Sequence, residues 1–207
     1  MIKMREQKNY LALELKDHVP FTLFGALTGI IIMIILFYGN FLPKIYPFSE
    51  NIFYILHPVH IFFSAIVTTS IFLKYNKNNL ILAVIIGYTG SIGIATISDS
   101  IIPFFGELFI DLPNTEIHLG FIEKPLFTNI PAFIGILLSN YKGFTKFPHS
   151  GHVLISTWAS LFHIIMAIGL SISTFQFVLI FIFLFFAVWF PCCTSDIIYP
   201  IIFKKNK

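Results

Sequence analysis

Six stretches of this chain are apolar enough and long enough to form membrane-spanning helices. The hydrocarbon core of a bilayer is about 30 Å thick, and a helix needs roughly 20 residues to cross it. The six windows are residues 20–39, 51–73, 80–98, 125–141, 152–173 and 175–191. Only 11% of the 207 residues are charged and 57% are hydrophobic, and a soluble fold of this size cannot cover so much apolar surface. The sequence therefore predicts an all-α, polytopic integral membrane helical bundle that forms a single domain in the lipid bilayer.

The distribution of lysine and arginine predicts the orientation of this bundle, because cytoplasmic segments carry an excess of both residues. Eleven of the thirteen fall on one side, in residues 1–19, 74–79, 142–146 and 192–207. Lys44 and Lys124 lie on the other side. We therefore expect six spans, a cytoplasmic N-terminal tail, a cytoplasmic C-terminal tail and a multi-pass protein of the cell (plasma) membrane. No nucleic-acid partner is expected, since a net charge of +3 with a single arginine makes no basic face.

The third window is expected to end at residue 98. Pro103 and Gly106 follow it, and both residues weaken or break a helix. Residues 99–124 are therefore predicted to form an outer loop with a re-entrant or interfacial segment.

An outer group of histidines and carboxylates is the strongest functional signal, because ionisable side chains inside a bilayer are costly unless they are paired. His57 and His60 lie three residues apart and share one helical face. The second and third windows are joined by a short connection, so they run antiparallel and pack side by side. Asp99 then lies at a similar depth to His57, and we expect the three side chains to face one another inside the bundle. The other outer candidates are Glu107, Glu116, His118 and Glu123.

Imidazole and carboxylate groups are ligands of Zn²⁺ and of non-haem iron. The outer group therefore predicts a divalent metal site, Zn or Fe, at the outer leaflet. Asp99 or Glu123 is expected to serve as the catalytic base for a metal-bound water, whose pKa the metal lowers to about 7.

A second group of candidate ligands lies on the predicted cytoplasmic side. Its members combine thiol, imidazole and carboxylate groups, a set that suits Zn, Cu or Fe: His149, His152, Cys192, Cys193 and Asp196. Cytoplasmic cysteines are expected to be reduced. His163 stands apart from both groups, because no partner for it at equal depth is evident in the sequence.

These residues favour a metal-dependent membrane enzyme, a hydrolase of a lipid or another apolar substrate. The outer group is denser and chemically more mixed than a site that only loads an ion. The main alternative is a transporter or channel for a metal ion or for protons. Two further alternatives are a haem b electron carrier with histidine axial ligands and a cofactor-free subunit of a membrane complex.

Overall fold

The computed structural model describes residues 2–76, 79–139, 146–169, 172–194 and 198–203. These residues form helices and connecting turns, with no strand among them. Five helical segments are long and apolar enough to cross a membrane: Val19–Tyr38, Leu42–Tyr75, Leu80–Ile110, Gly151–Ile168 and Thr174–Cys192. The all-helical class is therefore confirmed, and the five apolar segments indicate a membrane protein.

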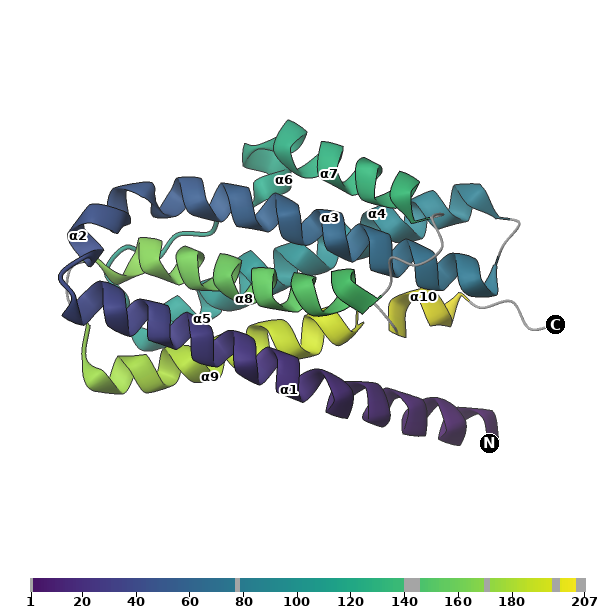
Figure 1. Ribbon diagram of the computed structural model, residues 1–207, viewed down its shortest axis with the longest axis horizontal. Helices are drawn as coiled ribbons and strands as arrows, with labels where there is room; N and C mark the ends of the chain where they lie inside the picture. The colour runs from purple at the N-terminus through teal and green to yellow at the C-terminus, as the bar shows by residue number, and fades with distance from the viewer. Residues whose placement is uncertain (1, 77–78, 140–145, 170–171, 195–197, 204–207) are drawn as a thin grey trace.

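The long helices form an elongated bundle (Figure 1). They are α1 (Ile2–Tyr38), α3 (Ser49–Tyr75), α4 (Leu80–Thr96), α7 (Pro125–Leu138), α8 (Lys146–Ile168) and α9 (Thr174–Cys193). The shorter elements are α2 (Leu42–Ile45), η1 (Tyr46–Phe48), η2 (Ile97–Ile101), α5 (Ile102–Ile110), α6 (Gly120–Glu123) and α10 (Tyr199–Ile202). Helix α3 is central and packs against α8, α4 and α7, while α1 packs against α8 and α9. Functional side chains on α3 are therefore enclosed by neighbouring helices.

The helix that begins at Leu80 is longer than the sequence predicts. It does not end at residue 98 but continues through η2 and α5 to Ile110. The element η2 is a π-helical turn, in which the Ile102 N–H donates to the Ile97 carbonyl, five residues back. Pro103 follows directly, and the wider turn accommodates a residue that cannot donate a backbone hydrogen bond. Pro103 and Gly106 are therefore both inside the helix, and both are buried.

Helix α7 is the shortest of the apolar helices that the sequence predicts as spans. It begins at Pro125, a residue favoured in the first helical turn. It ends at Leu138, so its 14 residues are about 21 Å long at 1.5 Å per residue. This is shorter than the hydrocarbon core, and α7 is not among the five segments long enough to cross it. The sixth span therefore stays a prediction.

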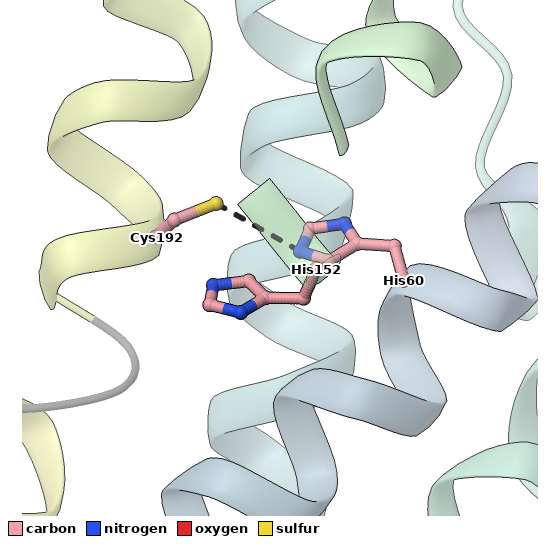
Figure 2. Close-up of side chains that lie close together, drawn as sticks. All are labelled: His60, His152 and Cys192. Carbon is pink, nitrogen blue, oxygen red and sulfur yellow. Dashed lines mark hydrogen bonds between the residues drawn. The ribbon is translucent and has the colours of Figure 1, made fainter. Parts of the chain in front are cut away.

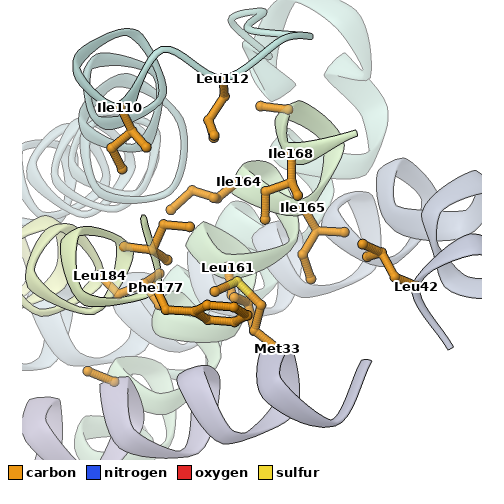
Figure 3. Close-up of a cluster of buried hydrophobic side chains, with 13 residues drawn as sticks. Met33, Leu42, Ile110, Leu112, Leu161, Ile164, Ile165, Ile168, Phe177 and Leu184 are labelled. Carbon is orange, nitrogen blue, oxygen red and sulfur yellow. The ribbon is translucent and has the colours of Figure 1, made fainter. Parts of the chain in front are cut away.

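Apolar side chains cover the outside of the bundle. Ile81, Phe109 and Leu137 are each more than 70% exposed, as expected of surfaces that face lipid rather than water. A buried apolar cluster joins α1, α8 and α9 at one end of the bundle and includes Met33, Ile165 and Leu184 (Figure 3). The polar side chains are gathered on the inside along α3, η2, α5 and α8. This arrangement places the candidate functional residues in the core.

Candidate metal centre

Asp99 is the centre of a buried hydrogen-bond network. It lies in the π turn η2 and is fully buried. Its Oδ2 atom is 2.9 Å from Nδ1 of His57 and 2.8 Å from Nδ1 of His60. The expectation that these three side chains face one another inside the bundle is confirmed. The three side chains meet because the two histidines share one face of α3 and because α3 packs antiparallel against α4.

The second oxygen of Asp99 is also fully used. Its Oδ1 atom accepts hydrogen bonds of 2.7 Å from the hydroxyls of Ser98 and Ser156. A carboxylate has about four lone-pair sites, and four donors occupy them here. The sequence analysis gives Asp99 the role of metal ligand and catalytic base. In the structure all four sites accept hydrogen bonds from protein side chains, so a metal ion would have to displace one of these donors, and both roles stay predictions.

These bonds also determine which nitrogen of each imidazole is available. An ionised carboxylate only accepts, so His57 and His60 each donate the Nδ1 proton to Asp99. In a neutral imidazole the lone pair is then on Nε2. This is the arrangement of metal-binding histidines, which donate their second N–H to a carboxylate that fixes the tautomer and the ring orientation. With Asp99 ionised, Nε2 is therefore the nitrogen of each histidine that could bind a metal.

The Nε2 atom of His60 faces a second cluster of potential ligands. The Sγ atom of Cys192 lies 3.8 Å from it. The imidazole of His152 stacks on that of His60, with ring centroids 5.7 Å apart and an interplanar angle of 9°. One ligand atom from each of the three residues lies within 4.8 Å of the others, and all three side chains are buried. Figure 2 shows how the three residues converge from α3, α8 and α9. This cluster can hold a metal ion.

The cluster combines residues that the sequence analysis places in separate groups. His60 belongs to the predicted outer group, whereas His152 and Cys192 belong to the predicted inner group. His152 lies six residues after the start of α8, and Cys192 lies one residue before the end of α9. His152 and Cys192 lie close to His60 rather than to His57, because His60 is about one helical turn further along α3. The structure therefore brings together one mixed cluster rather than the outer centre that the sequence predicts.

His57 has a different environment from His60. Its ring stacks on Phe53, with centroids 5.2 Å apart. Its Nε2 atom is buried, and no described residue forms a hydrogen bond with it. The backbone of α6 closes over this ring, since a Cβ atom at Gly120 would lie 3.0 Å from Nε2. The edge of the His57 ring that contains Cδ2 and Nε2 therefore faces Gly120.

Three of the other outer candidates, Glu116, His118 and Glu123, lie in the loop after α5 and in α6. Glu116 is exposed on this loop. Glu123 accepts hydrogen bonds from the Tyr54 hydroxyl, from the Leu119 N–H and from Nδ1 of His118. Partial burial alone would raise the pKa of the Glu123 carboxyl. The hydrogen bonds have the larger effect in the opposite direction, so the pKa of Glu123 lies below its usual value. Glu123 is therefore held as an acceptor. The described part of the chain does not bring it, Glu116 or His118 into the three-ligand cluster.

Two residues that the sequence analysis did not place together form a further buried pair. The Nδ1 atom of His163 lies 2.6 Å from Oε1 of Glu107, within hydrogen-bond distance, and both side chains are fully buried. The sequence analysis assigns Glu107 to a loop, because it ends the helix at residue 98. The continuation of the helix through α5 carries Glu107 into the bundle.

Three of the predicted inner ligands lie outside the described part of the structure. They are the side chains of His149, Cys193 and Asp196. The Cys192 side chain is buried, and the reduced state expected of the cysteines stays a prediction.

Comparisons of the chain with protein-family models, with curated proteins and with solved structures find no match. The chain is all-helical in its described residues, five of its helical segments are long and apolar enough to cross a membrane, and a buried His/Cys cluster can hold a metal ion. The chemistry of this cluster is therefore the basis for any functional conclusion.

Proposed function

We propose that the chain is a metal-dependent integral membrane enzyme that hydrolyses a lipid or another apolar substrate. The single observation that carries this proposal is the buried cluster of His60, His152 and Cys192. Three protein ligands leave a fourth position open, the arrangement of catalytic rather than structural zinc sites. A divalent ion there supplies an activated water by lowering the pKa of that water to about 7. Zn²⁺ suits imidazole and thiolate ligands, and iron is the second candidate.

The environment of the cluster supports this proposal in two ways. Asp99 orients His60, and such carboxylates strengthen both ligand basicity and metal binding. The surrounding helices have apolar outer faces, so a substrate dissolved in the bilayer reaches the bundle without crossing water. The site we propose is therefore inside the bundle, where α8 begins and α9 ends, rather than at the outer leaflet.

A second candidate function is the transport of a metal ion or of protons. One observation favours it. Buried titratable side chains continue from Cys192 and His152 through His60, Asp99 and His57. Such intramembrane chains are typical of ion pathways and proton relays. Uptake of Zn²⁺ into vesicles containing the protein, followed with an enclosed fluorescent indicator, would support this candidate over the enzyme.

We also propose six spans with both termini in the cytoplasm, with α7 as the short fourth span. The lysine distribution supports this orientation. A cysteine introduced at Asn114 should react with a maleimide that cannot cross the membrane, and one introduced at Lys205 should be protected in intact cells. The reverse labelling pattern would refute the proposed topology.

The enzymatic proposal is tested by lipid hydrolysis in vitro. Purified protein loaded with Zn²⁺ or Fe²⁺ is mixed with micelles of a lipid extract, and products are measured by mass spectrometry. We expect hydrolysis that stops with a chelator and returns when the metal is restored. His152→Ala should behave like the chelated protein because it removes a ligand. Thr157→Val is the matched control on the same helix, and it should keep wild-type activity. Metal-loaded protein that hydrolyses no lipid would refute the enzymatic proposal.

A further inference from the structure

The buried pair of Glu107 and His163 lies outside the metal cluster and has two unused polar atoms. Glu107 is on α5 and His163 is on α8, and the pair is joined by the 2.6 Å contact between Oε1 and Nδ1. The other two atoms of the pair, Oε2 of Glu107 and Nε2 of His163, are buried and have no hydrogen-bond partner among the residues that the structure describes. Buried polar groups are usually paired, and an exception needs an explanation. Both atoms have lone pairs that can accept a proton.

A titratable side chain connects this pair with the protein surface. The imidazole of His118 packs edge-on against that of His163, with ring centroids 5.4 Å apart and an interplanar angle of 71°. The His118 side chain is 16% exposed, and its neighbour Glu123 is 36% exposed. His118 therefore touches both the surface of the loop before α6 and the buried imidazole.

An apolar ring separates the pair from the Asp99 network. Phe53 packs edge-on against His163, with centroids 5.4 Å apart, and it also stacks on His57. A phenyl ring has no donor or acceptor for proton transfer. The pair is therefore connected to the loop surface through His118 and is separated from His57 by Phe53.

We propose that Glu107 and His163 form a buried proton-binding site that exchanges protons with the loop surface through His118. An incoming proton bonds to Nε2 of His163. The N–H bond at Nδ1 then breaks while an O–H bond forms at Oε1 of Glu107. The site ends as a carboxylic acid beside a neutral imidazole that is protonated on Nε2, and release reverses these steps. This site goes beyond the proposed enzymatic function and does not depend on metal binding.

Other titratable side chains on the elements around the pair belong to separate contacts. Tyr54 donates to Glu123, and His57 donates to Asp99. His152 and Cys192 lie in the metal-capable cluster. The Glu107 carboxyl and the His163 imidazole are therefore the groups that exchange the proposed proton.

The test is infrared difference spectroscopy of the full chain in lipid nanodiscs, between neutral and acidic buffer. We expect the carbonyl-stretch band of a protonated carboxylic acid to appear in acid and to be absent from Glu107→Gln. Glu107→Asp should shift this band, which identifies it if Glu107→Gln does not fold. A folded wild-type protein with no such band assignable to Glu107 would overturn the proposal.

The route is tested by the rate at which the band appears after a rapid drop in pH. His118→Phe should slow it by about 100-fold, the lower end of the contribution of a positioned proton-transfer group. Tyr46→Phe is the control, since it removes only a hydrogen bond from Asn114 on the same loop. It should leave the rate unchanged. A wild-type rate in His118→Phe would overturn His118 as the route.

Discussion

Replacing Asp99 with asparagine is expected to weaken metal binding by about 10- to 100-fold, the usual effect of losing a carboxylate that orients a histidine ligand. The Asp99 carboxylate accepts from His57, His60, Ser98 and Ser156 at once. An asparagine side chain has one accepting oxygen instead of two, and it lacks the charge that strengthens these hydrogen bonds. The His60 imidazole is then less firmly held in the orientation that directs Nε2 at Cys192.

The measurement is a competition titration of the metal against a chelator of known affinity. Thr96→Val is the matched control, because Thr96 is buried on the same helical run and its hydroxyl donates a hydrogen bond to the Ile92 carbonyl of its own helix. It should bind metal as the wild type does. Equal affinities for Asp99→Asn and the wild type would mean that Asp99 does not orient a ligand.

Replacing Gly135 with alanine is expected to destabilise the packing of α7 on α3 by about 1–3 kcal/mol, the usual cost of overfilling a packed interface. A Cβ atom at this position would lie 2.5 Å from the Phe62 carbonyl oxygen and 2.8 Å from the Ala65 Cβ. The first of these is a backbone atom and cannot rotate away. The two helices must therefore move apart, which separates α7 from its main neighbour.

The measurement is the free energy of unfolding in mixed micelles, followed by the loss of helical signal. Gly93→Ala is the control, because a Cβ atom at Gly93 has no atom within 4 Å. It should leave stability unchanged or raise it slightly, since alanine favours helix formation over glycine. Similar losses in both variants would show that helix propensity, rather than the close approach of α7, determines the effect.

The contact between α3 and Asp99 is predictable from the sequence because it depends on local periodicity. His57 and His60 share a face by their spacing, and a short connection makes the next helix antiparallel. The same reasoning predicts that the helix beginning at Leu80 ends at residue 98, which is too early, because it treats Pro103 as a helix break. A π turn absorbs this proline, and such a turn leaves no clear mark in a sequence. Glu107 is consequently assigned to a loop, and its pairing with His163 is not predicted.

The metal-capable cluster is less predictable because it depends on how distant helices are placed. His60, His152 and Cys192 come from three helices, and lysine counts sort such residues only by side of the membrane. This sorting separates His60 from the other two. In the structure they meet because α3 passes beside α8 along its length and α9 ends next to it. Contacts of this kind follow from tertiary packing rather than from residue spacing.

The metal content of purified protein tests the central claim most directly. We expect about one divalent ion per wild-type chain by plasma emission, as for a site with one three-ligand cluster. His60→Ala and Cys192→Ala should each lose this ion. His57→Gln should keep it, because His57 lies outside the cluster. A wild-type chain without metal, or full metal content in Cys192→Ala, would contradict a metal centre formed by His60, His152 and Cys192.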